Sequence, residues 1–215
     1  MQRRNANHAR GIDVSHWQGQ IDWVAVKKSG IRFAFVKATE GQLFVDDMFA
    51  SHIEGAKSQG ILVGAYHFSK ASDPEESREE ADFFLENVKG KQLELPHVLD
   101  IETKKGRTKD KIVAICRAWL ERVKSETGVQ PMIHTYPSFI DSYLDASLSH
   151  IPLWYACYND RHLEERGGWE RWEFLQYTNI GSVPGIKGNV DLNEYAGAAE
   201  HLTAKYGAGN SASNG

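Results

Sequence analysis

Short runs rich in β-branched and aromatic residues alternate with longer helix-like segments along most of this chain, and this order constrains the fold more than any other feature. The β-type runs cover residues 11–16, 32–39, 62–69, 97–102, 132–136, 153–158, 173–178 and 190–195. The helix-like segments, with apolar residues three or four apart, cover residues 23–28, 47–59, 74–89 and 109–127. Strands that alternate with helices pack as βα units around a parallel sheet, so the order predicts an α/β barrel.

The final third of the chain departs from this alternation. After about residue 150 the connections shorten and Gly and Pro become frequent, so we expect the last three strands to follow one another with little helix between them. The 215 residues suit a single domain of barrel size. We therefore predict five βα units and three plainer strands, with a polar N-terminal extension at residues 1–10, the barrel at 11–206 and a flexible tail at 207–215.

Charge and hydropathy exclude two classes of partner. The chain has 25 Lys and Arg against 29 Asp and Glu, a net charge of −4, and no long basic block, which makes nucleic acid a poor partner. No apolar stretch approaches the roughly 18 residues of a membrane helix, and the opening MQRRNANHAR has no apolar core of a secretory signal. Cys116 and Cys157 show neither disulfide-framework nor zinc spacing.

Two carboxylates at the end of the fourth predicted strand are the strongest chemical signal. Functional residues of a βα barrel lie at the carboxyl ends of its strands, and Asp100 and Glu102 follow an apolar run there. Residues two apart on a strand point to the same side, so both carboxyls open into one mouth. Repulsion between them, with Asp13 or Asp191 nearby, raises the proton affinity of at least one. One protonated and one ionised carboxyl are the equipment of a glycosidase.

Aromatic residues near the strand ends fit a sugar substrate. Their flat apolar faces stack on the C–H faces of sugar rings, while their polar edges reach the hydroxyl groups. The residues in question are Trp17, Tyr66, Tyr136, Trp154 and Tyr177. The sequence leaves one alternative of a different class. His16, His67 and His134 also lie near strand ends and with Asp13 or Asp100 form a possible zinc site, as in metal-dependent barrel hydrolases.

Eight segments of the chain carry a family resemblance, in family order and at family spacing. They are GIDVSHWQG, FAFVKATEG, GAYHF, LPHVLDIE, PMIHTY, PLWYA, FLQYT and VPGIKGNVDLNEY. In these segments the chain resembles the family 25 glycoside hydrolases, the Chalaropsis-type lysozymes that act as N-acetylmuramidases. The resemblance covers nearly the whole chain and implies a flattened TIM-like barrel of (β/α)5β3 type. One departure is Leu175, where family members carry Trp before the Gln-Tyr pair of the seventh strand.

The resemblance also implies roles for individual residues. The catalytic Asp-x-Glu of the family falls on Asp100 and Glu102, its first-strand acid on Asp13 and its last-strand acid on Asp191. The groove positions of the family, together with two further strand-end residues, give an expected substrate-binding set. The members of this set are Lys37, Glu40, Tyr66, His67, Tyr136, Trp154, Gln176 and Tyr177.

The implied activity is cleavage of the β-1,4 bond between N-acetylmuramic acid and N-acetylglucosamine in cell-wall peptidoglycan. Glu102 is the expected general acid, and the nearness of Asp100 disfavours inversion, which leaves retention with acetamido participation or a covalent aspartyl intermediate. No cofactor is implied, the expected state is a monomer, and the expected place of action is extracellular or at the cell wall, as a secreted enzyme or a phage endolysin. The alternatives are the metal-dependent hydrolase and an inactive cell-wall-binding module.

Overall fold

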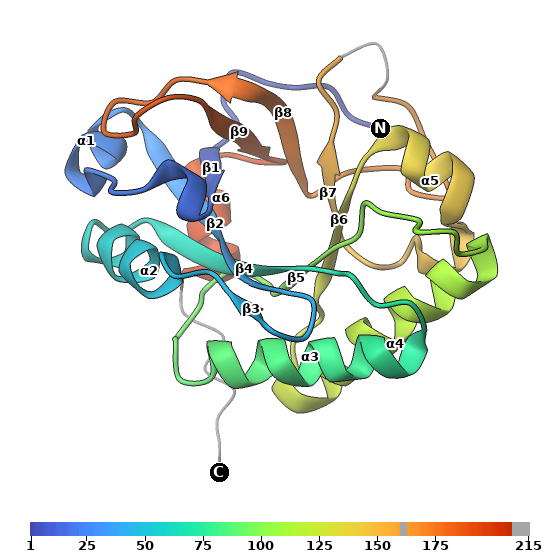
Figure 1. The fold of residues 1–215 in the computed structure, drawn as a ribbon. Coiled ribbons are helices and arrows are strands. Elements are labelled where there is room, and N and C mark those ends of the chain that lie inside the picture. The colour runs from blue at the N-terminus through green and yellow to red at the C-terminus, as the bar shows by residue number, and fades with distance from the viewer. Residues whose placement is uncertain (160–162, 208–215) are drawn as a thin grey trace.

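The computed structural model describes residues 1–159 and 163–207, and eight of its strands close into a barrel (Figure 1). These strands are β1 (Arg10–Val14), β2 (Ile31–Glu40), β4 (Leu62–Phe68), β5 (Val98–Asp100), β6 (Met132–Thr135), β7 (Leu153–Ala156), β8 (Phe174–Gly181) and β9 (Val190–Tyr195). The order around the barrel is β1-β2-β4-β5-β6-β7-β8-β9, and β9 pairs back onto β1. An additional strand of two residues, β3 (Phe44–Val45), pairs with the end of β2.

A helix follows each of the first five barrel strands, and the described residues between the last three strands contain none, so the (β/α)5β3 prediction is confirmed. The helices are α1 (Trp23–Lys28), α2 (Phe49–Ser58), α3 (Pro74–Val88), α4 (Lys109–Thr127), α5 (Pro137–Tyr143) and the C-terminal α6 (Ala199–Tyr206), with 3-10 turns η1 (His16–Gln18) and η2 (Ala146–Leu148). Helices α3 and α4 lie side by side along one flank of the barrel (Figure 1). The sequence did not locate α5, α6 or β3, because such short elements contain too few apolar positions to show a period.

The last strand differs in direction from the other strands of the barrel. Strand β9 runs antiparallel to both of its neighbours, β8 and β1, while the other pairs of barrel strands are parallel. Residues 182–189 connect β8 to β9, and this connection is shorter than the dozen or so residues that a parallel crossover requires. The start of β9, rather than its end, therefore lies beside the carboxyl ends of the other strands.

Local sequence signals fix the ends of the long helices. The side chain of Asp73 accepts hydrogen bonds from the backbone N–H groups of Glu75 and Glu76 and so caps α3, with Pro74 in the first turn. Helix α4 begins at the cap Thr108 and ends at Gly128, whose φ of 70° is the left-handed conformation that glycine adopts without strain. These helices therefore start and stop where the sequence predicts.

Alternation along the strands divides the apolar residues into two layers. One cluster lies between the strands and the surrounding helices, and a second fills the barrel interior. The interior cluster includes Phe33, Phe35, Met132, Trp154 and Phe174, and Leu202 of α6 joins it. Two glycines make room for it: a Cβ on Gly11 would lie 2.3 Å from the ring of Phe33, and one on Gly64 would lie 2.7 Å from the ring of Phe35. The packed interior leaves chemistry to the ends of the barrel.

The first residues of the chain pack against the barrel. Residues of the predicted polar N-terminal extension contact the barrel, since Arg4 pairs with Glu194 and the side-chain amide of Gln2 donates to the carbonyl of Trp172. From residue 208 onward the predicted tail at 207–215 lies outside the described residues. Among the described helices, none combines the length and apolar character needed to cross a membrane.

Candidate active site

The mouth of the barrel, formed by the carboxyl ends of the parallel strands and the start of β9, collects most of the polar side chains that point inward. Inward positions alternate with outward ones, so each strand delivers one or two such side chains. Asp13 on β1 lies directly opposite Asp191 on β9, and Asp100 on β5 lies beside His134 on β6. The four acids predicted from the sequence thus come from β1, β9, β5 and the segment directly after β5. Asp191 reaches the mouth only because β9 is antiparallel.

Asp13 is buried at the base of the mouth and held by two amides. Its Oδ2 accepts hydrogen bonds from Nδ2 of Asn193 at 2.8 Å and from Nε2 of Gln176 at 3.0 Å. The same Gln176 nitrogen lies 3.4 Å from Oδ2 of Asp191. Burial first, and then repulsion from Asp191, raise the pKa of Asp13 well above its ordinary value despite these hydrogen bonds.

Asp100 and Glu102 differ in depth. Asp100 is 6% exposed, whereas the side chain of Glu102 is 33% exposed and lies at the surface of the mouth. Burial and the charge of Glu102 raise the pKa of Asp100 well above its ordinary value, and burial and the charge of Asp191 raise the pKa of Glu102. Oδ1 of Asp100 is buried without a hydrogen-bond partner in the described protein. A deep carboxyl with a free oxygen therefore sits beneath a reachable carboxyl that favours its protonated form.

The surroundings of Glu102 do not neutralise it. Nε2 of His134 lies 3.7 Å from a Glu102 carboxyl oxygen, but burial lowers the pKa of His134 to about 3, so the ring is neutral near pH 7. The phenol of Tyr136 donates to the backbone carbonyl of Glu102 at 3.2 Å, leaving the carboxyl to the solvent side. Among the residues that the structure describes, no charged cation pairs with Glu102, and its pKa stays raised.

A cationic side chain approaches the site from β2. Nζ of Lys37 lies 2.5 Å from Oε2 of Glu40, and Lys70 pairs with the other oxygen of Glu40. Although burial raises the pKa of Glu40, the hydrogen bonds from these two lysines outweigh it and lower that pKa. The charge of Lys37 also opposes the rise in the pKa of Asp100. Lys37 therefore favours the ionised form of Asp100, but burial and repulsion outweigh it.

A cavity of 570 Å³ opens directly beside Glu102, and we call it the mouth cavity. Tyr136, Ala156, Tyr158 and Arg166 are among the residues that line it. The phenol of Tyr158 donates to Oε1 of Gln176 at 2.7 Å and so links this cavity to the amides around Asp13. The cavity is lined by residues near the ends of β6 and β7 and by α5, on one side of the mouth.

Three residues of the predicted substrate-binding set do not present a free face to the mouth. His67 points outward from β4, where its Nδ1 lies 2.8 Å from Oγ1 of Thr39 and its Nε2 lies 3.1 Å from Glu80 of α3. Tyr177 points outward from β8, and the guanidinium of Arg4 covers its ring at 3.5 Å. Because Tyr66 and Gln176 point inward, their neighbours His67 and Tyr177 must point outward.

Trp154 is the third of these residues, and it lies below the mouth. It is 1% exposed, its ring packs 4.5 Å from Phe35 and 4.0 Å from His134, and its Nε1 donates to Oδ1 of Asn193 at 2.7 Å. It forms the floor that supports His134 and Asn193 rather than a surface for stacking. Tyr66, partly buried with its ring 6.0 Å from Trp154, adjoins this floor. Burial, and then the charges of Asp13 and Asp100, raise the pKa of Tyr66.

Two residues outside the predicted set belong to the site. Asn193 holds Asp13, and Tyr158 holds Gln176 while lining the mouth cavity. Strand periodicity contains the signal for both, since Asn193 follows Asp191 by two positions and Tyr158 follows Ala156 by two. Both residues lie at predicted strand ends, but a side-chain amide and a phenol lack the catalytic pattern of paired carboxylates, so the sequence assigned neither a role.

The histidines of the alternative metal site are not brought together. His16 lies 2.8 Å from Oδ2 of Asp46, His67 lies on the outer wall, and only His134 faces the mouth. Among the described residues, Asp100, Glu102 and His134 do place one ligand atom each within 4.8 Å of one another. Two carboxylates and one imidazole are donors that zinc accepts, so this trio is the remaining candidate for a metal.

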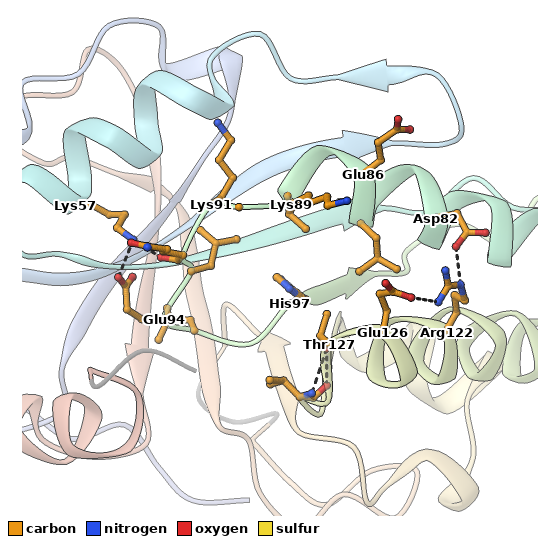
Figure 2. Close-up of a pocket in the computed structure, with 17 residues that line it drawn as sticks. Lys57, Asp82, Glu86, Lys89, Lys91, Glu94, His97, Arg122, Glu126 and Thr127 are labelled. Carbon is orange, nitrogen blue, oxygen red and sulfur yellow. Dashed lines mark hydrogen bonds and ion pairs between the residues drawn. The ribbon is translucent and has the colours of Figure 1, made fainter. Parts of the chain in front are cut away.

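A second and larger cavity, of 810 Å³, lies at the opposite end of the barrel, and we call it the amino-end cavity (Figure 2). The ends of α2, α3 and α4 and the segment before β5 line it. Figure 2 shows Lys57 paired with Glu94, and Arg122 placed between Asp82 and Glu126. None of the predicted site residues lies in this cavity.

Comparisons with known proteins agree with this fold. Residues 12–186 match the family described as Glycosyl hydrolases family 25. An Escherichia coli K12 protein named as the uncharacterized protein YegX is 37% identical over 199 residues, covering 90% of this chain and 72% of its own length. Lysozyme M1 of Streptomyces globisporus is 34% identical over 91% of this chain and 70% of its own. The crystal structure of the bacterial lysozyme from Streptomyces coelicolor superimposes with a TM-score of 0.84 at 33% identity, covering 94% of this chain and 98% of that one.

Proposed function

The chain belongs to the family 25 glycosyl hydrolases and is a glycoside hydrolase of the lysozyme, or muramidase, type. From this premise we propose that it cleaves the β-1,4 bond between N-acetylmuramic acid and N-acetylglucosamine in peptidoglycan. One observation carries the proposal. Asp100 and Glu102 share the mouth, and the pKa of each is raised by burial and by a neighbouring carboxylate. Such a pair is suited to protonating a glycosidic oxygen and stabilising the positive charge that develops on the sugar.

Glu102 is the general acid in this proposal. Its raised pKa keeps it protonated where an ordinary glutamic acid is ionised, and its partial exposure gives a substrate access to the proton. As the bond from the sugar to the leaving oxygen breaks, Glu102 transfers its proton to that oxygen. The resulting carboxylate then accepts a proton from the water that completes hydrolysis.

The spacing of the two carboxyls supports retention of configuration. One oxygen of Asp100 and one of Glu102 lie within 4.8 Å, whereas inverting enzymes keep their carboxyls roughly 6.5–9.5 Å apart to admit a water. We assign the nucleophile to the carbonyl oxygen of the substrate's 2-acetamido group, which bonds to C1 as the glycosidic bond breaks. The unpartnered Oδ1 of Asp100 is free to accept a hydrogen bond from the acetamido N–H and to stabilise the charge on the ring that forms.

Asp13 and Asp191 shape the field of the site. Asp13 is buried and held by Asn193 and Gln176, so it acts on the chemistry through its charge and contacts. Asp191 raises the pKa of Glu102 and so helps the acid to retain its proton. Because these four acids come from one chain, we expect a monomer to be active, at the bacterial cell wall or outside the cell.

Mass spectrometry of the soluble products from purified peptidoglycan tests this function. Products with muramic acid at the reducing end support it, whereas glucosamine at the reducing end identifies a glucosaminidase and released peptide stems identify an amidase or peptidase. Binding to the wall without any new reducing ends identifies a binding module.

The trio of Asp100, Glu102 and His134 favours one second candidate, a metal-dependent hydrolase. In that mechanism the metal would activate a water, and its removal would abolish turnover. Dialysis against a strong chelator separates the two candidates. The proposed muramidase keeps its rate after dialysis, and a rate that is lost and then restored by added zinc identifies the metal enzyme.

A further inference from the structure

Large apolar side chains are exposed at one edge of the mouth. Trp17 of η1 is 81% exposed and Leu43, in the turn before β3, is 92% exposed. The other five tryptophans of the chain are all at most 7% exposed. Exposed apolar groups gathered at one place mark binding surfaces in soluble proteins, so Trp17 needs an explanation that the packing of the barrel does not supply.

These side chains belong to one connected surface. The ring of His16 lies 4.6 Å from that of Trp17 and 5.7 Å from that of Phe44. The backbone N–H and Nδ1 of His16 both contact Oδ2 of the buried Asp46, at 3.0 and 2.8 Å, so the imidazole has a fixed place between the two rings. We call His16, Trp17, Leu43 and Phe44 the rim surface.

The rim surface continues into the mouth. Nζ of Lys37 lies 5.5 Å from the centre of the Phe44 ring, and the charge of Lys37 acts on Asp100. Turn η1 follows β1, and β3 pairs with the carboxyl end of β2, so both parts of the surface stand at the open end of the barrel. A chain molecule bound over Asp100 can therefore extend across Lys37 and Phe44 to Trp17.

We propose that the rim surface is a subsite for the glycan strand of peptidoglycan, where Trp17 and Phe44 stack on sugar rings. This inference rests on the proposed function. A glycan presents apolar C–H faces and hydroxyl edges in alternation. An aromatic row flanked by the ammonium of Lys37 and by the hydrogen-bonded His16 and Asp46 offers matching partners. The occupant is the substrate itself, because the surface is continuous with the mouth.

The position of the general acid assigns a direction to the bound strand. Glu102 gives its proton to the leaving sugar, and the mouth cavity beside it belongs to β6 and β7. The rim surface belongs to β1 and β2, which lie across the barrel from β6 and β7 (Figure 1). The rim surface therefore holds sugars on the non-reducing side of the cleaved bond, and the mouth cavity receives the leaving side.

Tryptophan fluorescence gives a direct test of binding, because Trp17 is the one tryptophan of this chain that solvent reaches freely. The protein used is Glu102→Gln, whose slowed turnover leaves the strands intact during the measurement, and the probe is a set of uncross-linked glycan strands of defined length. We expect strands that reach the rim surface to protect the fluorescence from quenching by acrylamide, and the quenchable fraction to be absent from Trp17→Phe. Unchanged quenching at saturating strand overturns the proposal.

Kinetics on the active enzyme give a second test. We expect Trp17→Ala to raise KM for long strands roughly three- to tenfold while kcat stays unchanged. Trp17→Phe, which keeps an aromatic face, should recover most of this loss, and strands too short to reach the rim should show no difference. An unchanged KM at every length overturns the subsite but leaves the proposed function standing. Undiminished turnover by Glu102→Gln overturns the proposed function itself.

Mapping the products tests the direction. On a reducing-end-labelled strand we expect the wild type to cleave where the non-reducing part fills the rim surface, and Trp17→Ala to release shorter non-reducing fragments as well. If Trp17→Ala instead changes only the length of the reducing-end fragments, the assigned direction is wrong.

Discussion

The charged side chains of the amino-end cavity and the four acids of the mouth differ in how their charges are matched. In the amino-end cavity, Lys57 meets Glu94 at 3.0 Å and Arg122 meets Asp82 at 2.6 Å, so opposite charges pair (Figure 2). The hydrogen bond from Arg122 lowers the pKa of Glu126, as expected of a carboxylate with a cationic partner. Lining charges of this kind already have their partners within the protein.

At the mouth the carboxylates face one another instead. The pKa values of Asp13, Asp100, Glu102 and Asp191 are all raised, by burial first. The mouth cavity has a volume of 570 Å³ and the amino-end cavity one of 810 Å³, so volume alone would favour the amino end as the active site. Mutual repulsion is an energetic cost that a fold retains where chemistry requires it, which makes the unmatched charges the better guide to function.

The largest expected effect is that of Glu102→Gln. Loss of the general acid should reduce release of reducing ends from purified peptidoglycan by about 10²–10⁴-fold, while circular dichroism shows a normal fold. The matched control is Glu94→Gln at the amino-end cavity, which removes a carboxylate of the paired kind. Equal losses in the two variants would contradict the contrast between the cavities.

Asp100→Asn should separate function from stability. Turnover falls by about 10²-fold because the developing positive charge loses a stabilising carboxylate. Because its pKa is raised in the folded state, Asp100 stabilises the fold only while it is protonated. That stability is lost as pH rises from the ordinary value of 3.8 through the folded-state pKa. The variant should therefore have a higher Tm than the wild type at pH 7, with about 2–4 °C for each kcal/mol in a chain of this size.

The Tm measured at low pH tests this interpretation. Below pH 3.8 the wild-type carboxyl is protonated in both states, and the difference in Tm should vanish. A lower Tm for Asp100→Asn at pH 7 would show that the carboxylate is stabilising and that its pKa is not raised.

Asp191→Asn should shift the pH profile with a smaller effect on the maximal rate. Asp191 raises the pKa of Glu102, so its neutralisation makes Glu102 ionise more readily. The alkaline limb of kcat/KM, where the general acid loses its proton, should then move to lower pH. An alkaline limb at unchanged pH would contradict the proposed effect of Asp191 on the pKa of Glu102.

The smallest effect is expected for Glu94→Gln considered by itself. Its partner Lys57 is partly exposed, and such pairs contribute about 0–1 kcal/mol. In the wild type, Oε2 of Glu94 accepts a hydrogen bond from the backbone N–H of Val63 at 3.0 Å, and the glutamine amide oxygen of the variant can accept the same bond. Urea denaturation should change little and turnover should stay within about twofold of the wild type. A large loss of activity would assign the amino-end cavity a role that its matched charges do not indicate.

Several parts of the site could be read from the order of residues. The alternation of strands and helices gave the (β/α)5β3 arrangement, and the Asp-x-Glu after an apolar strand marked Asp100 and Glu102. The alternation of side chains along a strand, applied to β4, predicts that Tyr66 and His67 face opposite sides, so that His67 points away from the mouth. That error lay in treating a strand end as a cluster rather than as two faces.

Other features have no local signal. The burial of Trp154 depends on Phe35, and the hydrogen bonds that hold Asp13 come from Gln176 and Asn193, more than 160 positions away. The antiparallel direction of β9, which brings Asp191 to Asp13, depends on a short connection and on closure of the sheet. Such contacts exist only once the barrel has closed.

By itself the sequence determined which residues can carry charge, which face of each strand they occupy and where the helices begin, because these follow from side-chain chemistry and backbone periodicity. Only the tertiary structure decided which carboxylates repel one another, which cation finds a partner and which aromatic ring remains in water. The reason is physical: pKa values and exposure depend on burial and on distances through space, and distant parts of the chain set both.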